Sequence, residues 1–309
     1  MKKYTLGFVL FAALSSAQAA TIIKIATEAP DGTAWMRELR AGAEGVKKHT
    51  DDRVEIKFYP GGVMGDEPTV LRKIKIGQLQ GGAFTGGELA QVDKVRAQLD
   101  PLLKQSMEKT GYEILGISGG GFAYLVSVND IKGKDDLKAA KVWIPQGDRI
   151  AEAGFKAGGV TPIALPLADV YTSLQTGLID TAANTPAGTI AFQWHTKVKH
   201  MVDLPLTYVV GILIVDKKVF DALSPEDRKT LSDELGAAFT RLDKINRDDN
   251  TQAREALQKQ GIAIFKPNAA ETASWESVGA DARKNLVGDG EISAEMSAAL
   301  DKALAAARK

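Results

Sequence analysis

The alternation of hydrophobic and polar positions predicts strands and helices in turn along the first third of the chain. Segments 21–27 and 54–59 are rich in β-branched residues, and a turn containing Pro and Gly follows each of them. Between them, hydrophobic residues recur at three- and four-residue spacing over 33–49, which is typical of a helix buried along one face. The pattern continues with a helix over 67–78, a strand over 82–85, a helix over 95–109 and a strand over 112–117. This order predicts a parallel sheet covered by helices, with ligands at the carboxyl ends of its strands.

The middle third has the same alternation, with glycines where helices are expected to end. Between two strands, the glycine-rich stretch 118–121 is typical of a hinge between lobes. The nearly continuous apolar run 204–215 predicts a long strand that is buried on both faces and crosses from one lobe to the other. The other predicted elements are strands over 122–128 and 141–145 and helices over 149–157 and 167–177.

The longest predicted helix covers residues 224–260. It starts with Ser224 as N-cap, Pro225 at the first helical position and two acids in the first turn. Its 37 residues would extend about 55 Å if unbroken, which is more than one small lobe. We therefore expect an α/β fold of two lobes with this helix lying across both, the alternative being two helices with a bend at Gly236. A strand over 262–265 and Ala-rich helices complete the chain.

The N-terminus has the pattern of an export signal. Lys2 and Lys3 precede the apolar run 6–14, and Ala17-Gln18-Ala19 is a small-x-small cleavage site. Both this run and the later apolar runs are shorter than the ~20 residues that a membrane-spanning helix needs. We expect cleavage after Ala19.

Charge and cysteine content narrow the functional classes. The 309 residues include 39 Lys+Arg and 39 Asp+Glu, and removing 1–19 takes away two Lys and no acid, so the balance becomes 37 against 39, or −2. Nucleic-acid binding needs a cationic surplus, which this chain lacks. The absence of Cys excludes disulfides, thiolate metal sites, cysteine nucleophiles and anchoring through a lipidated N-terminal cysteine. An exported protein without that anchor is retained by a second membrane, so we expect a Gram-negative periplasm.

Few catalytic patterns are present. His195 and His200 are five residues apart, which does not match a helical zinc motif, and the sequence contains no phosphate-binding loop. The segment 116–120 matches the Gly-x-Ser-x-Gly pattern of a nucleophile elbow around Ser118. An elbow requires a helix directly after the serine, whereas a strand is predicted there. A serine hydrolase that uses Ser118 with one of the two late histidines is therefore the alternative function.

Four aromatic residues are candidate ligand contacts: Trp35, Phe84, Trp143 and Trp194. A single aromatic residue is more often part of the core than of a ligand site. Trp35 and Phe84, however, are predicted at the carboxyl ends of strands, where an open α/β sheet binds its ligand.

The segments 141–145 (Lys-Val-Trp-Ile-Pro), 159–162 and 170–180, with Asn184 before Pro186, resemble the solute-binding subunits of TRAP transporters, of the dicarboxylate-binding (DctP) type. The most specific part is Val-Tyr-x-x-Leu-Gln-x-Gly-x-Ile-Asp. The resemblance implies a two-lobed periplasmic binding protein fold that closes on a small organic acid. It also implies delivery of that acid to the small and large membrane subunits of an ion-driven permease, with no catalysis and no cofactor.

Trp143 stands where the family usually has an Arg that clamps the ligand carboxylate. Arg149 could take over that role if the following turn folds back. Alternatively, the ligand is held by stacking on Trp143 and by hydrogen bonds from Gln146 and Asn184. We expect Trp143 to line the ligand site, and the seven candidate ligand-binding residues are Trp35, Phe84, Trp143, Gln146, Arg149, Asn184 and Trp194.

The chain is also shorter than the family pattern near Val92–Val95, where an additional strand and apolar segment are expected between the third strand and the next helix. One crossing strand would then be missing from the first lobe. We expect lobe I to comprise 20–118 and 205–245, and lobe II to comprise 119–204 and 246–309.

Overall fold

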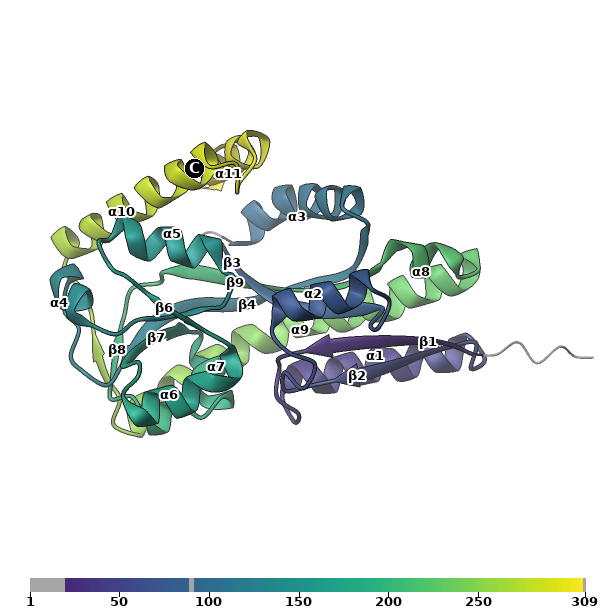
Figure 1. Cartoon of the computed structure of the whole chain (residues 1–309), viewed down its shortest axis with the longest axis horizontal. Helices are drawn as coiled ribbons and strands as arrows, with labels where there is room; N and C mark the ends of the chain where they lie inside the picture. Colours follow the sequence, from purple (N-terminus) through teal and green to yellow (C-terminus); the bar gives the residue numbers. More distant parts are fainter. Residues whose placement is uncertain (1–19, 89–91, 308–309) are drawn as a thin grey trace, which may run out of the picture.

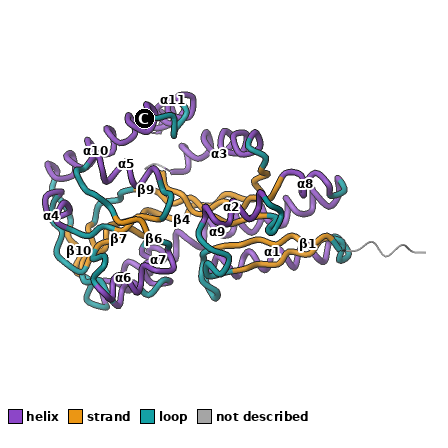
Figure 2. Tube along the Cα trace, viewed as in Figure 1, coloured by secondary structure: helices purple, strands orange, loops and turns teal. Residues whose placement is uncertain are grey.

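The computed structural model describes residues 20–88 and 92–307. The expected signal peptide, 1–19, lies outside these residues, and so do 89–91, which adjoin the expected shortening. Helices lie on both sides of a long, twisted sheet (Figures 1 and 2). In the described part of the chain, no helix is long and apolar enough to span a membrane.

Strands and helices alternate through most of the chain, as the hydrophobic pattern predicts. The strands are β1 (Thr21–Thr27), β2 (Val54–Tyr59), β3 (Gly81–Glu88), β4 (Tyr112–Ser127), β5 (Trp143–Pro145), β6 (Ile163–Leu165), β7 (Thr181–Asn184), β8 (His200–Val202), β9 (Thr207–Asp216) and β10 (Ala263–Phe265). The helices are α1 (Ala34–His49), α2 (Glu67–Lys75), α3 (Val92–Lys109), α4 (Lys134–Ala139), α5 (Arg149–Ala157), α6 (Val170–Thr176), α7 (Pro186–Ala191), α8 (Lys217–Ala222), α9 (Pro225–Lys259), α10 (Ala269–Gly288) and α11 (Ala294–Ala307), with 3-10 turns η1 (Leu167–Asp169) and η2 (Trp194–Thr196).

The main sheet has the order β10-β8-β4-β9-β3-β1-β2, and β7 also pairs with β4. Strand β1 is parallel to β2 and β3, whereas β9 is antiparallel to both of its neighbours, β3 and β4. The sheet is therefore mixed rather than wholly parallel. The short strands β5 and β6 form a second, parallel sheet.

Strand β4 differs from the prediction. The sequence predicts two strands separated by a glycine-rich hinge, but residues Tyr112–Ser127 form one strand that pairs with β9 in its first part and with β7 and β8 in its last. The glycines form irregularities inside it, with register shifts between Ile114 and Gly116 and between Gly119 and Gly121. Glycine here marks a bulge in a continuous strand instead of a loop.

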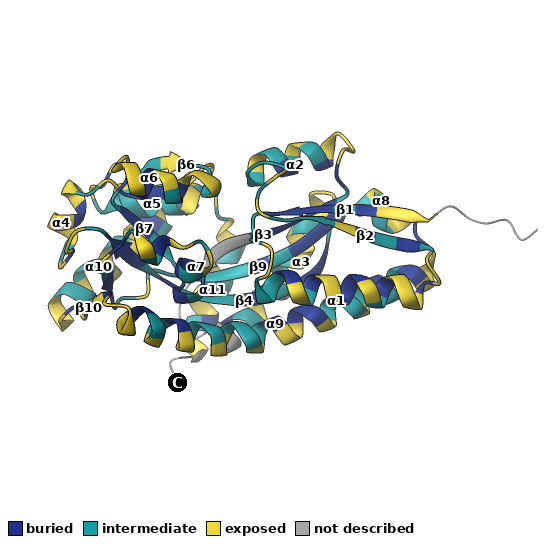
Figure 3. Ribbon diagram, turned by 90° about the horizontal axis from the view of Figure 1, so that it is seen from below, coloured by how far each residue is buried: buried dark blue, intermediate teal, exposed yellow. Residues whose placement is uncertain are grey.

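Helix α9 confirms the prediction of one long helix. It spans 35 residues, about 52 Å at 1.5 Å per residue, and passes beneath the strands (Figure 3). The Ser224 hydroxyl accepts a 3.0 Å hydrogen bond from the backbone N–H of Asp227, as expected of an N-cap.

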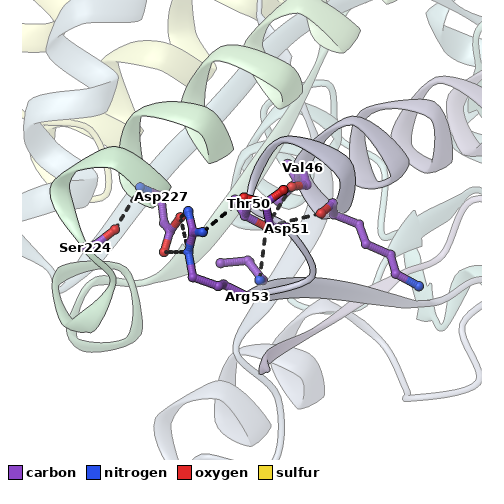
Figure 4. Close-up of polar contacts among 8 residues, drawn as sticks. Val46, Thr50, Asp51, Arg53, Ser224 and Asp227 are labelled. Atoms are coloured by element: carbon purple, nitrogen blue, oxygen red, sulfur yellow. Dashed lines mark hydrogen bonds and ion pairs between the residues drawn. The ribbon is translucent and has the colours of Figure 1, made fainter. Parts of the chain in front are cut away.

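The first turn of α9 is tied to the start of β2 by an ion pair (Figure 4). Arg53 donates two hydrogen bonds to Asp227 Oδ1, at 2.8 Å from Nη2 and 3.2 Å from Nε. The pKa of the buried Asp227 carboxyl is held below its usual value, mainly by the hydrogen bond from Arg53. The Thr50 hydroxyl fixes the adjoining turn by bonding to the Val46 carbonyl at 2.8 Å.

The hydrophobic core is divided in two. In one half, α1, β1 and the first part of α9 pack together, and a second cluster joins α2 to β3, β4 and β9. In the other half, the end of β4 packs with α6, β7 and the last part of α9. Of the buried residues of α9, Leu231, Leu235 and Phe239 belong to the first half and Leu257 to the second. The long helix therefore contributes to both cores.

The C-terminal helices also reach both halves. Helix α10 packs against α5, and α11 packs against α3 through a small cluster that includes Val95, Leu99, Leu300 and Ala303 (Figure 1). Strands β4 and β9, helix α9 and the α10–α11 pair thus all connect the two halves.

Candidate functional site

Polar side chains from both halves follow the carboxyl ends of strands near the boundary between them. Glu28 comes directly after β1, and Gln146 comes directly after β5. The two halves meet beside these residues, because a β-carbon at Gly147 would lie only 3.0 Å from Cγ of Pro68 in α2. Gly147 has a φ of +85°, which favours glycine. This lobe junction is the candidate functional site, since open α/β sheets bind ligands at the carboxyl ends of their strands.

Glu28 is a functional candidate that the sequence argument missed. Burial, and secondarily the charge of Asp66, raise the pKa of Glu28 from 4.5 to about 7. Asp66 is the N-cap of α2, where its Oδ1 accepts a 3.0 Å hydrogen bond from the N–H of Thr69. A carboxyl group with such a pKa is part protonated at neutral pH and can donate a hydrogen bond to an anion. Its place immediately after a predicted strand is the signal that could have identified it.

Trp143 and Trp194 lie together in the core of the second half. Trp143 is 4% exposed and Trp194 1%, and their rings meet edge to face at 5.3 Å. The indole N–H of Trp143 donates to the carbonyl of Leu165 at 3.0 Å, which joins β5 to β6. These contacts give Trp143 a structural role, and a contact with solute stays a prediction.

Trp35 and Phe84 lie in different clusters of the first half. Trp35 packs edge to face on Phe239 of α9 at 5.2 Å, and its buried indole N–H has no hydrogen-bond partner among the described residues. A β-carbon at Gly211 in β9 would lie 2.2 Å from Cη2 of Trp35, so glycine is needed for the ring to reach the strand. Phe84 is buried beside α2 at 9% exposure.

The polar candidates are more exposed. Asn184 ends β7, and its Oδ1 accepts a 2.8 Å hydrogen bond from the N–H of Thr185. Gln146 is exposed. Arg149 is also exposed, and it forms a 3.2 Å ion pair with Glu152 one turn further along α5. Gln146 is thus the candidate placed beside the contact between the two halves, and Arg149 is engaged in a surface pair.

The geometry at Ser118 does not fit a nucleophile elbow. Its side chain is fully buried, lies within β4 and is followed by more strand instead of a helix. Within the described residues, its Oγ has no hydrogen-bond partner, so no imidazole is in place to act as base. His195 instead faces the carbonyl of Thr189 at 3.4 Å. Likewise, the part of the chain that the structure describes holds no group of three or more His, Cys, Asp or Glu suited to a metal ion.

Comparison with known proteins identifies the family. The family described as "Bacterial extracellular solute-binding protein, family 7" (DctP) matches residues 96–287. The C4-dicarboxylate-binding periplasmic protein DctP of Rhodobacter capsulatus is 24% identical over 255 residues, covering 75% of this chain and 76% of the relative. The 2,3-diketo-L-gulonate-binding periplasmic protein YiaO of Escherichia coli is 22% identical over 279 residues, covering 83% and 84%.

Solved structures show the same fold. A TRAP periplasmic solute-binding protein from Desulfovibrio salexigens with bound orotic acid has a TM-score of 0.83 at 18% identity, covering 93% of this chain and 99% of that one. DctP7 of Bordetella pertussis, a receptor binding pyroglutamic acid, has a TM-score of 0.83 at 21% identity, covering 94% and 100%. With the family match covering more than half of its residues, the chain belongs to bacterial extracellular solute-binding protein family 7.

Proposed function

We propose that this protein is the solute-binding subunit of a TRAP-type secondary transporter. It captures a small organic acid between its two lobes and delivers it to the small and large membrane subunits of the permease. The observation that carries the proposal is the family match over residues 96–287, which makes the chain a solute-binding protein and leaves the serine hydrolase without support. The divided core, joined by two strands and a long helix, is an arrangement suited to hinged closure.

The proposed location is the periplasm, reached by export and cleavage after Ala19. The signal pattern of residues 1–19 supports it, as do relatives named as periplasmic proteins. The proposed lobes are 20–118 with 205–245, and 119–204 with 246–309. The two hydrophobic cores support this division along α9, because Phe239 packs in the first core and Leu257 in the second.

The proposed ligand is an organic acid held mainly by neutral hydrogen-bond donors. The named relatives and solved structures bind dicarboxylate, diketo-gulonate, orotic acid and pyroglutamic acid. In this chain Trp143 replaces the usual Arg, and Arg149 pairs with Glu152. We therefore assign carboxylate recognition to Asn184, Gln146 and protonated Glu28. Of the four aromatic candidates, Phe84, Trp143 and Trp194 are buried and contribute by packing, and Trp35 is the more exposed one. Neutral donors attract a carboxylate less strongly than a guanidinium group does, so the affinity depends more on the geometry of the hydrogen bonds.

A thermal-melting screen of residues 20–309 against mono-, di-, keto- and sugar acids tests the proposal. Binding to the folded state stabilises by RT ln(1 + [L]/Kd), which is ~2.7 kcal/mol at a hundredfold excess over Kd. At least one acid is expected to raise the melting temperature by several degrees. A screen in which no acid shifts the transition would count against the proposed function.

A further inference from the structure

The middle of α9 contacts the glycine bulge of β4 through three polar side chains on one face of the helix. Asp243, Asn246 and Asn250 have the three- and four-residue spacing that aligns side chains on a helix. They lie between the residues of α9 that belong to the first core and the residue that belongs to the second. We call these three residues the hinge clamp.

The hinge clamp satisfies backbone groups at the bulge. The Asp243 carboxylate accepts a hydrogen bond from the N–H of Gly119. The amide of Asn246 donates to the carbonyl of Gly119 at 2.8 Å, and the amide of Asn250 donates to the carbonyl of Gly120 at 2.7 Å. A bulge removes backbone groups from the regular ladder, and here side chains of α9 replace the missing partners.

The clamp also reaches an element on each side of the hinge. Arg96 of α3 donates to both oxygens of Asp243, at 2.7 and 2.9 Å, and to Asp100 at 3.0 Å. On the other side, the Asn250 Oδ1 accepts a 3.1 Å hydrogen bond from the N–H of Ala187 in the first turn of α7. A chain of hydrogen bonds therefore runs from α3 through α9 to α7, across the point where β4 passes between the halves.

The glycines permit this approach. A β-carbon at Gly121, where φ is +106°, would lie 2.4 Å from the Asn250 amide nitrogen. One at Gly119 would lie 3.1 Å from Asp243 Oδ1 and 2.0 Å from the Tyr208 hydroxyl. Any larger residue would push α9 away from the strand. The glycines therefore allow the close approach of the hinge clamp to the backbone of β4, in addition to the positive φ at Gly121.

We propose that the hinge clamp sets the balance between open and closed lobes and favours the arrangement in which Gly147 meets Pro68, so that substitutions far from the solute alter its affinity. The effect on affinity rests on the proposed function, while the effect on lobe position does not. A protein whose binding-competent form is only part of the population binds with proportionately weaker apparent affinity.

The test measures the distance between spin labels on the two lobes without any solute. The chain has no Cys, so Ile76→Cys and Ile150→Cys, at positions 63% and 48% exposed, give one label on each half. Asn250→Asp keeps the acceptor for Ala187 and removes the donor to the carbonyls of Gly120 and of Asn246. Asp243→Asn removes the charge that pairs with Arg96. Each variant is expected to at least double the fraction of molecules with the longer distance between labels. For an acid that the melting screen shows to bind, each variant is also expected to raise the Kd two- to tenfold.

Thr251→Ala is the matched control, because the Thr251 hydroxyl donates to a carbonyl of α9 itself, that of Arg247, at 3.0 Å. Its distance distribution is expected to equal that of the wild type. If a clamp variant does not fold, the same distance measurement is made on Asn246→Ala, which removes the hydrogen bond donated to the Gly119 carbonyl. Folded clamp variants with the wild-type distribution would overturn the proposal. Failure of every acid to bind would affect the proposed function alone, since the unliganded distances still report on the clamp.

Discussion

At the scale of single residues, Trp143 is the position for which the sequence predicts a ligand contact and the structure shows a place in the core. The resemblance implies an Arg at this position and so points to the ligand, whereas the contacts of Trp143 are with Trp194 and the Leu165 carbonyl in the core. Trp143→Ala is expected to lower the free energy of unfolding by roughly 3–5 kcal/mol, because a large buried ring is lost. Urea unfolding measures this. Trp143→Phe, which keeps a ring but loses the N–H donor, is the control, with an expected cost of about 1 kcal/mol. A loss below 1 kcal/mol for the Ala variant would contradict the core role.

Glu28 gives the lobe junction a defined pH dependence. Since burial raises its pKa from 4.5 to about 7, the folded state holds the proton more tightly than the unfolded chain. The contribution of Glu28 to stability therefore falls as the pH rises from about 4.5 to about 7. Glu28→Gln removes this loss, so the variant is expected to exceed the wild type by roughly 1–3 kcal/mol at pH 8 and to match it at pH 4.

Chemical unfolding of both proteins at the two pH values checks this, with Glu44→Gln on the exposed face of α1 as control. An equal difference between wild type and Glu28→Gln at pH 4 and pH 8 would refute the shift.

At the scale of elements, the strongest local signals predicted structure well. The N-cap Ser224 and the hydrophobic spacing beyond it predict α9 to within one residue at each end, because capping and periodicity act along one helix. The same holds for α5, whose observed bounds are the predicted ones. For strand β4 the sequence predicts two strands, because glycine lowers strand propensity. Partners distant in sequence, β9 and the clamp on α9, keep it continuous, and local patterns do not contain them.

The candidate site follows the same rule. The sequence marks Trp143 and Trp194 as separate aromatic candidates, but their mutual contact depends on the packing of β5 against η2, which no local pattern reports. Glu28 was missed for a similar reason, since its raised pKa arises from burial and from Asp66 on another element.

At the scale of the whole molecule, two features bear on closure. Several elements join the two cores, with α11 on α3 and α10 on α5 in addition to the hinge strands. The shortening expected near Val92–Val95 stays a prediction.

We propose that the two lobes capture an organic acid by closing over the junction between Gly147 and Pro68. The most direct measurement is the distance distribution between spin labels at Ile76→Cys and Ile150→Cys, recorded with and without saturating amounts of the acid that gives the largest melting shift. The acid is expected to move the population to the shorter distance, with half-saturation at the Kd found by melting. An acid that binds and leaves the distribution unchanged would contradict it.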